Sequence, residues 1–280
     1  MPAVRVDIER ALWAEFSAHI PEHVSNHRYG GHRPRISNYI VFRKLLEVLA
    51  FGISYASAAD HLVSASTLRR RRDEWIEAGI FKRVEQAALD AYEKVVGLDL
   101  ENISVDGCLV KAPWGGKEFS GPNPVDRGKP GMKRSLMVDG NGIPLGVILA
   151  PANRHDSPLL RPTLECLRRF GFDLPEKITV HLDAGYDSRV TRDLLDELGC
   201  DHQISKKGLP LQAGRRWVVE RTHAWHNSFG KLLRMTERHL ASADAWVCLA
   251  NAIIVIRRII GEAWKTHRWA RRPRRPVSGK

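Results

Sequence analysis

The sequence predicts an α/β fold in which a mixed sheet with flanking helices follows a small all-α domain. Apolar residues recur at helical spacing through residues 1–95. From about residue 97, short β-branched segments alternate with helical ones, and Asp-Gly-Asn-Gly at 139–142 is a strong hairpin signal. We therefore expect a helical domain at 1–95, an α/β domain at 96–265, and a basic tail at 266–280 that is disordered until it meets DNA.

Two helices are predicted at the start of the helical domain, with a Gly- and Arg-containing loop at 28–34 between them. Large apolar residues recur there at three-to-four spacing, which places them on one face of each helix. The residues with this spacing are Leu12, Trp13, Phe16 and Ile20 in the first helix and Val41, Leu45, Val48 and Leu49 in the second.

A helix-turn-helix is predicted at residues 54–78. It consists of a short helix at 54–62, a turn near 63–64, and a second helix that opens at 66 or 67 and closes at Gly79. Its second helix, which would lie in the DNA major groove, carries Arg69, Arg70, Arg71 and Arg72. Consecutive residues point all around a helix, so some of these arginines must face away from the groove. A solvated, salt-bridged surface helix explains the stretch equally well.

The α/β domain is predicted as strand, hairpin, helix, strand, helix, strand and helix. The strands are expected at 102–108, 133–138, 143–150, 178–182 and 202–204. One helix runs from 156 or 157 to near Gly171 and the next from 188 to 198. The last helical stretch, 217–264, has a predicted break near Phe229 and Gly230.

The charge of the chain is unevenly distributed. Net charge is +12, of which residues 1–95 contribute +2, residues 96–204 contribute −3 and residues 205–280 contribute +13. We expect a polyanion to meet the basic last quarter, while the acidic middle attracts cations. A solubility device is the alternative, but an acidic middle beside a basic end suits a nuclease better.

Several classes of protein and site are excluded by the sequence. The four cysteines lie far apart without a CxxC pair, which argues against a structural zinc or a disulfide framework and fits a reducing cytoplasm. His223 and His226 have no third zinc ligand at familiar spacing, and a DNA-contacting or plain surface explains them better. The glycines near Lys117 and Lys129 lack a phosphate-loop motif, so we expect a basic loop over DNA and no nucleotide cofactor. With no apolar leader and a longest apolar run of only 245–256, neither secretion nor a membrane span is expected.

Three acids are the candidate metal ligands. Asp106 and Asp183 each follow an apolar run and are expected at the ends of strands, and Glu220 lies early on a helix among valines, close to a buried face. Such hard oxygen ligands suit Mg²⁺ or Mn²⁺, and two ions about 4 Å apart would support attack on a phosphodiester. The chain has 32 acids, however, so other sets of three are open. Asp139 also follows an apolar strand but reads as a turn residue, and Asp156 and Asp187 read as helix N-caps.

Four segments in register resemble the DDE transposases of bacterial insertion sequences, specifically the insertion-sequence-five group. They are Val-Asp-Gly at 105–107, Gly-Pro-Asn-Pro-Val-Asp-Arg-Gly-Lys-Pro-Gly at 121–131, Asp-Ala-Gly-Tyr-Asp-Ser at 183–188 and Arg-Trp-Val-Val-Glu-Arg-Thr at 216–222. The resemblance implies a ribonuclease-H-like domain in which Asp106, Asp183 and Glu220 are the catalytic metal ligands. Arg216 matches an arginine that could contact phosphate. Ala213 and Asn227 depart from the family's broader signature, which has Tyr and Lys there.

The resemblance also implies the function and partners. We expect an enzyme that binds the terminal inverted repeats of its element, cleaves the ends and joins the 3′-hydroxyls to target DNA. It would use two Mg²⁺ or Mn²⁺ ions, act as a homodimer or larger assembly, and work at the nucleoid in the cytoplasm. The alternative is a catalytically silent DNA-binding regulator. The expected DNA-contacting residues are Arg69, Arg70, Arg71, Arg72, Lys129, Lys133, Arg216, Arg221 and Lys231.

Overall fold

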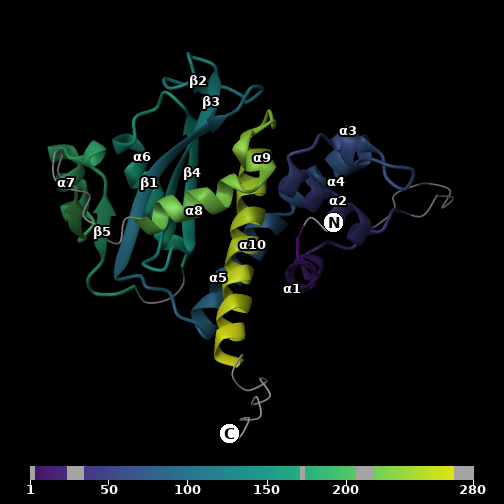
Figure 1. The fold of residues 1–280 in the computed structure, drawn as a ribbon, viewed down its shortest axis with the longest axis horizontal. Coiled ribbons are helices and arrows are strands. Elements are labelled where there is room, and N and C mark those ends of the chain that lie inside the picture. Colours follow the sequence, from purple (N-terminus) through teal and green to yellow (C-terminus); the bar gives the residue numbers. More distant parts are fainter. Residues whose placement is uncertain (1–3, 24–34, 171–173, 206–216, 268–280) are drawn as a thin grey trace, which may run out of the picture.

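A computed structural model describes residues 4–23, 35–170, 174–205 and 217–267 of the chain (Figure 1). The predicted loop at 28–34, Arg216 and most of the predicted basic tail lie outside these residues. In the described parts, a group of helices at the N-terminal end stands beside a sheet, and one long helix runs between them.

The N-terminal part of the chain is helical, as predicted. They are α1 (Val6–Ala18), α2 (Asn38–Phe51), α3 (Tyr55–Ala58), α4 (Ala65–Glu77) and α5 (Ile80–Val95). Rings of Phe16, Phe42 and Trp75 pack together, with the Phe16 and Trp75 centroids 5.0 Å apart. This aromatic cluster joins α1, α2 and α4, and gives the small domain a buried centre.

The predicted helix at 54–62 is wrong in length. α3 ends at Ala58, because the Asp60 carboxylate accepts hydrogen bonds from the N–H groups of Leu62 and Val63 and closes a turn there. The Ser64 hydroxyl then accepts from the N–H of Thr67 and caps α4, and Gly79 follows its C-cap in the left-handed conformation. The turn and the second helix of the predicted motif are therefore confirmed.

The sheet is mixed, as predicted. Its strands are β1 (Asn102–Lys111), β2 (Gly121–Pro122), β3 (Pro130–Val138), β4 (Pro144–Pro151), β5 (Thr179–Leu182) and β6 (Asp201–Ile204). The order is β2-β3-β1-β5-β6, with β4 also paired to β3. β1, β5 and β6 are parallel to one another, and β3 is antiparallel to β1 and β4. The long central β1, flanked by an antiparallel hairpin and by parallel strands, gives the ribonuclease-H-like arrangement.

Helices cover both faces of this sheet. Ser135 of β3 bonds to Thr163 of α6 (Ser157–Glu165), with 2.7 Å between the two hydroxyl oxygens. The next residue, Leu136, packs with Val218 and Val219 of α8 (Trp217–Asn227). Because successive residues of a strand point to opposite faces, α6 and α8 lie on opposite faces of β3. The remaining elements after β4 are the 3-10 turns η1 (Cys166–Arg169) and η2 (Ala184–Tyr186), and the helix α7 (Arg189–Glu197).

The long helix α10 (Leu240–His267) is the shared core of the molecule. It packs along α5 and α1 and against β4. Of the described helices it alone is long and apolar enough to cross a membrane, but 78% of its apolar window is buried within the protein, as in a soluble protein's core helix. One hydrophobic cluster runs from Val4 to Val255, so the apolar core is continuous across the domain boundary expected at residue 95.

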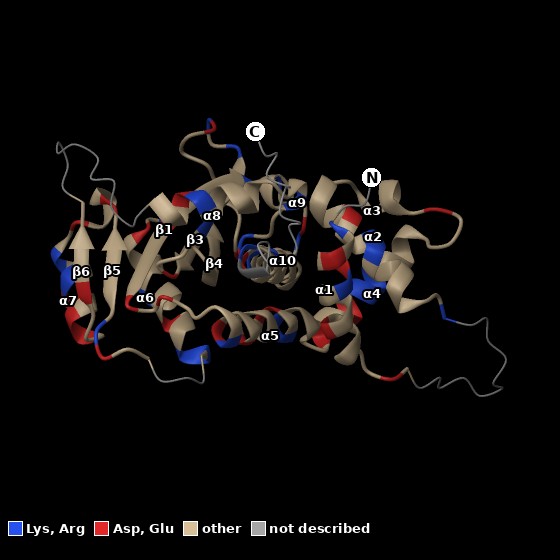
Figure 2. Ribbon diagram, turned by 60° about the horizontal axis from the view of Figure 1, so that its bottom comes forward, with Lys and Arg blue, Asp and Glu red and all other residues tan. Residues whose placement is uncertain are grey.

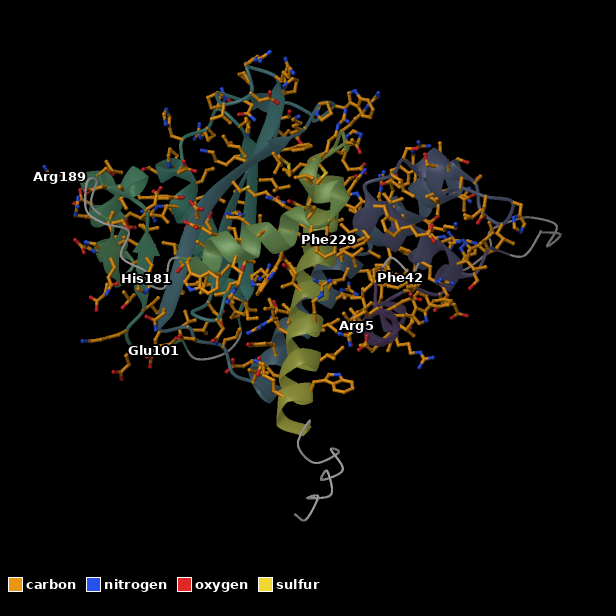
Figure 3. All side chains as sticks on the ribbon, in the orientation of Figure 1. Arg5, Phe42, Glu101, His181, Arg189 and Phe229 are labelled. Atoms are coloured by element: carbon orange, nitrogen blue, oxygen red, sulfur yellow. The ribbon has the colours of Figure 1, made fainter. Side chains whose placement is uncertain are left out.

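Two glycines allow the backbone of the N-terminal helices to contact the backbone of α9. A Cβ on Gly52, which has a φ of +65°, would lie 2.6 Å from the carbonyl carbon of Gly230, and a Cβ on Gly230 would lie 2.6 Å from that of Phe51. Gly230 opens α9 (Gly230–Leu233), directly after Phe229, at the predicted break (Figure 3). A side chain at either position would force the end of α2 away from α9.

Candidate active site

Asp106 and Asp183 lie level with each other on neighbouring parallel strands. The register pairs Ser104 of β1 with His181 of β5, and each aspartate follows two residues later. β5 ends at Leu182, so Asp183 is at the end of its strand as predicted. The same prediction for Asp106 is wrong, because pairing with β3 carries β1 on to Lys111. Asp106 therefore lies mid-strand, at the level where β5 stops covering the edge of β1.

The Asp183 carboxylate is held by the backbone that follows it. Its Oδ1 atom accepts a hydrogen bond of 2.8 Å from the N–H of Gly185 and so caps the start of η2. That turn buries Tyr186, which is 1% exposed. Burial raises the pKa of Tyr186, and so do the charges of Asp156, Asp106 and Asp183, in that order. The Tyr186 hydroxyl therefore stays protonated at physiological pH.

Glu220 lies in the first turn of α8 and is exposed. The expectation that it sits against a buried face is wrong, because its neighbours Val218 and Val219 turn to the sheet and Glu220 turns away. The helix is fixed further by Thr222, whose hydroxyl donates to the carbonyl of Gly142 over 2.7 Å. α8 therefore lies across β1 and β3, with Glu220 in its first turn.

His223 connects this helix to Asp106. Its Nε2 atom lies 3.8 Å from Oδ2 of Asp106. Burial and then the charge of Arg134 lower the pKa of His223 to about 3, so the imidazole is neutral at physiological pH. The expectation that His223 and His226 form a surface or contact DNA is wrong. Both are buried, and His226 Nε2 lies 2.7 Å from Oδ1 of Asn251.

Arg134 of β3 is fully buried on the same face. It donates to the amide oxygen of Asn227 and lies 3.6 Å from the Cys108 sulfur. Asn227 is the position at which the family's broader signature has Lys, and a second buried cation beside Arg134 would be costly. Arg134 therefore supplies a positive charge beside Asn227, where the family's broader signature has Lys.

The donor atoms of the three predicted ligands suit a divalent cation, but the structure does not gather all three. Carboxylate oxygens are the ligands that Mg²⁺ and Mn²⁺ prefer, and Asp106 and Asp183 are level at one edge. Within the described ranges, however, no three His, Cys, Asp or Glu side chains are close enough together to hold a metal ion. Glu220 lies one helical turn before His223. Its side chain would have to move toward the two aspartates to share a metal ion with them.

The four arginines of α4 divide into two pairs. Arg69 and Arg70 are exposed, whereas Arg71 and Arg72 are 1% and 6% exposed. Arg71 donates to Asn38, and Arg72 pairs with Glu237 over 2.8 Å. Arg71 and Arg72 are therefore corrected from DNA contacts to structural residues. Figure 2 shows basic and acidic residues interspersed on this helix.

Two of the predicted lysines are also buried. Lys231 is 2% exposed, and its ammonium lies 2.6 Å from Oε1 of Glu237. Lys133 lies 2.9 Å from Oδ1 of Asp156. Neither can reach DNA in this structure, so both predictions are corrected. Their burial reflects ion pairs, with an acid six residues on for Lys231 and with an acid beyond the next strand for Lys133.

The remaining predicted contacts are at or near the surface. Lys129 is exposed, and Arg221 is stacked between Trp217 and Trp225, with its guanidinium carbon 4.5 and 4.9 Å from their ring centroids. Arg216 lies outside the described residues. Lys117, expected in a basic loop over DNA, is exposed, and exposed basic residues that sequence reasoning did not single out are Lys111, Arg127, Arg234 and Arg238.

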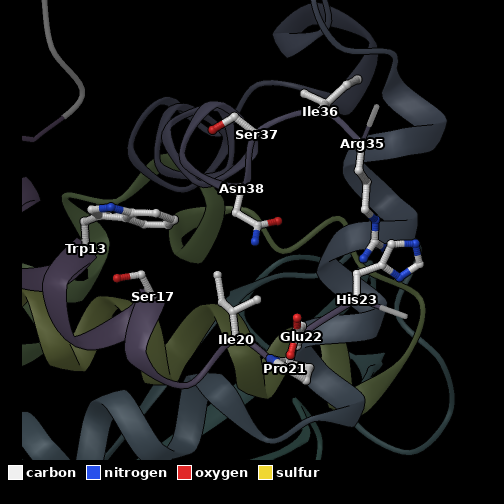
Figure 4. A pocket seen from close by; sticks show the side chains of 10 residues that line it. All are labelled: Trp13, Ser17, Ile20, Pro21, Glu22, His23, Arg35, Ile36, Ser37 and Asn38. Carbon is white, nitrogen blue, oxygen red and sulfur yellow. The ribbon is translucent and has the colours of Figure 1, made fainter. Parts of the chain in front are cut away.

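A hollow of about 480 Å³ lies away from these acids, on the N-terminal helices (Figure 4). It borders residues outside the described parts and includes none of the predicted ligands. Its lining residues are Trp13, Ser17, Ile20, Pro21, Glu22, His23, Arg35, Ile36, Ser37 and Asn38.

Comparison with known proteins identifies the family of this chain. The family model described as the transposase DDE domain matches residues 98–256. A protein of Burkholderia cepacia, named provisionally as a transposase for insertion sequence element IS402, is 36% identical over 148 residues, which cover 50% of this chain and 70% of that protein. Among solved structures, the catalytic domain of Mos1 mariner transposase matches with a TM-score of 0.34 and 14% identity, over 66% of this chain and 88% of that one. The Mos1 mariner paired end complex with Mn matches with a TM-score of 0.34 and 13% identity, over 93% and 86%. On the family match and the Burkholderia relative, the chain belongs to the DDE transposases of bacterial insertion sequences.

Proposed function

We propose that this transposase binds the terminal inverted repeats of its insertion sequence, cleaves the element's ends and joins the freed 3′-hydroxyls to target DNA. Asp106, Asp183 and Glu220 are the catalytic residues. The observation that supports this most directly is the parallel register of β1 and β5, which places Asp106 and Asp183 level where the edge of β1 opens. DDE transposases use divalent metal ions, and for this chain we propose two, Mg²⁺ or Mn²⁺.

The chain's own residues position the acids. Gly185 holds the Asp183 carboxylate through its N–H group, and His223 contacts Asp106 from α8. Asp106, Asp183 and Glu220 would hold the metal ions, which would supply activation of the attacking water or 3′-hydroxyl and stabilisation of the leaving oxygen. The helix α8 supplies Glu220 from the face of the sheet opposite to α6.

DNA binding is proposed to begin at α4, where Arg69 and Arg70 are exposed beside a capped helix start. Lys129, Arg221 and Arg216 are proposed phosphate contacts nearer the acids, and the basic tail adds contacts that do not depend on sequence. Because two ends of the element must be cut and joined together, we propose that a dimer or larger assembly forms on the DNA.

The test is a strand-transfer assay with Mg²⁺ or Mn²⁺ on DNA that carries the element's ends. Asp183→Asn should abolish transfer while leaving binding to the ends intact. Asp187→Asn is the matched control, because the same chemical change four residues later affects only an exposed pair with Arg192. If the wild type and Asp183→Asn bind equally and neither transfers strands, the catalytic role is wrong and a DNA-binding regulator remains.

A further inference from the structure

A second hollow opens beside the last residues of β1. It encloses about 530 Å³. Its lining comes from the end of β1, the loop between β2 and β3, the last residue of α8 and the end of α9. It contains none of the predicted metal ligands and none of the predicted DNA contacts. The lining residues that matter here are Val110, Lys111, Asp126, Asn227, Leu233 and Arg234.

The hollow continues a line of contacts between β1 and α8 that starts at Asp106. His223 Nε2 lies 3.8 Å from Oδ2 of Asp106. One helical turn later, the amide nitrogen of Asn227 lies 4.0 Å from the Cys108 sulfur. The next residue of β1 on this face is Val110, which lines the hollow. At about 3.3 Å per residue it is about 13 Å from Asp106 along the strand, a distance that a few nucleotides of DNA span.

Arg234 is fixed at the edge of this hollow by its backbone. It forms an isolated parallel bridge with Lys111, and the N–H of Met235 donates to the carbonyl of Lys111 over 2.9 Å. Met235 and Leu232 are fully buried, and α9 packs on both β1 and α2 (Figure 1). The Arg234 side chain is exposed and forms no ion pair with another described residue. The fold therefore holds a free cation in a defined place.

Lys111 gives the hollow a second cation. Its side chain is 67% exposed, and its Nζ atom lies 4.0 Å from Oδ2 of Asp126, too far for a hydrogen bond. That carboxylate oxygen is buried and accepts no hydrogen bond from a described residue. Asp126 thus attracts the ammonium toward the hollow without forming a close pair. An anion that enters between Lys111 and Arg234 would give both cations a closer partner.

Leu233 supplies an apolar wall beside the two cations. Its side chain is 52% exposed and lines the hollow together with Val110. A nucleotide matches this lining, because its phosphate suits the cations and its sugar and base present apolar surface to the leucine. A free phosphate or sulfate ion would make no use of the apolar wall. The chemistry of the lining therefore favours a nucleotide that belongs to a DNA strand.

We propose that this hollow binds one nucleotide of the strand that is cut, a few nucleotides from the phosphate at Asp106, with its own phosphate between Lys111 and Arg234. The proposal rests on the proposed function, which places cleavage at Asp106. Lys111 and Arg234 are positioning residues. They hold the strand along β1, so that the scissile phosphate meets the acids, and they read no sequence because phosphates carry none.

The test combines a substitution in the protein with neutral phosphates in the DNA. Methylphosphonates replace the phosphates near the cut one at a time, and fluorescence anisotropy measures the affinity of the full chain without metal. Arg234→Gln should bind unmodified DNA about 10-fold more weakly and lower the salt dependence by about one unit. At the contacted position, a methylphosphonate should weaken the wild type similarly and Arg234→Gln no further. Losses that add at every position would overturn the proposal.

Two matched variants guard against indirect effects. Asp126→Asn should tighten binding several-fold, because it removes the negative charge from the hollow, and loss of folding cannot produce such a gain. Arg189→Gln makes the same chemical change as Arg234→Gln at a side chain that is 93% exposed on α7, and should bind as the wild type does. If Arg234→Gln behaves as Arg189→Gln, or alters only the oligomeric state, the hollow is no DNA subsite.

Asp183→Asn separates this inference from the proposed function. It should abolish strand transfer and keep the wild-type pattern of methylphosphonate effects. If it is inactive while Arg234→Gln shows no effect at any one phosphate, the subsite is wrong and the proposed cleavage site stands. If Asp183→Asn transfers strands as the wild type does, the proposed function fails, and the placement of the subsite beside the cut fails with it.

Discussion

The Nε2 atom of His223 lies 3.8 Å from Oδ2 of Asp106, where the helix that carries Glu220 packs against the central strand. Residues 220 and 223 are neighbours on one side of α8. A shift of the helix would therefore change the position of Glu220 relative to Asp106. His223 is a positioning residue for two of the proposed metal ligands at once.

We expect His223→Phe to lower strand transfer about 10- to 100-fold while DNA binding is unchanged, because Asp106 loses the group that orients it. His226→Phe is the matched control. It is also a buried histidine on α8, but its partner is Asn251. Strand-transfer assays at saturating Mn²⁺ measure the activity of both variants, and thermal melts measure their stability. Equal losses of activity in the two would show that packing of α8, and not the contact with Asp106, is responsible.

A buried ionic cluster joins the N-terminal helices to the catalytic part. Glu237 accepts from Tyr55 and Trp246 at 2.9 and 3.0 Å, and pairs with Arg72 and Lys231. Its pKa is lowered, since the two cations outweigh the effect of burial. We expect Glu237→Gln to reduce the free energy of unfolding by about 3–5 kcal/mol, because it leaves two buried cations without a counter-charge.

Urea denaturation would measure that change, with Glu197→Gln as the control. Glu197 also pairs with an arginine, Arg161, but on the surface, so its loss should leave the unfolding midpoint unchanged. A midpoint for Glu237→Gln that matches the control would contradict a stabilising role for the cluster.

Arginines of α4 should separate into two classes on substitution. We expect Arg69→Ala and Arg70→Ala each to weaken DNA binding and to reduce the salt dependence of binding by about one unit. Arg71→Ala should instead lower stability, because its guanidinium is buried against α2. Fluorescence anisotropy at several salt concentrations distinguishes these results. If Arg69→Ala and Arg70→Ala both bind DNA with the salt dependence of the wild type, α4 is not part of the DNA interface.

Asp139 should make stability depend on pH. It is fully buried in the β3–β4 turn and accepts hydrogen bonds from the N–H groups of Asn141 and Ile143. Burial raises its pKa from 3.8 to about 6. The folded state thus holds this proton more tightly than the unfolded state, so the stabilisation is present below pH 4 and is lost as pH rises through 6.

Asp139→Asn carries no titrating proton at this position. We expect the free energy of unfolding of the wild type, relative to this variant, to fall by on the order of 2–3 kcal/mol between pH 4 and pH 6.5. Urea denaturation at a series of pH values gives the difference. A difference that stays constant with pH would show that Asp139 is ionised to the same extent in both states.

Elements with local signals were predicted well from the sequence. The Asp-Gly-Asn-Gly hairpin forms because Asp139 binds the turn's own N–H groups, and Gly79 ends the arginine helix in the left-handed conformation. Asp183 was found at a strand end for the same reason, since β5 is short and stops at a local turn. In each case the determining contacts lie within a few residues.

The errors have long-range causes. Arg72 is buried by Glu237, which is 165 residues away, and Lys133 is buried by an acid beyond the next strand. The side of α8 that meets the sheet could not be known before the sheet was placed, so Glu220 was expected near a buried face. The spacing of apolar residues shows which side of a helix is buried. It does not show which charged residue will form a buried ion pair.

The position of α10 late in the chain determines when the N-terminal helices can complete their core. This helix leaves the ribosome after every other described element, yet α1 and α5 bury their apolar faces against it. The N-terminal helices therefore have no complete core while translation continues. We expect a chain interrupted before residue 240 to lose the structure of its N-terminal helices, so that a truncated product could not occupy the element's ends in place of the intact enzyme.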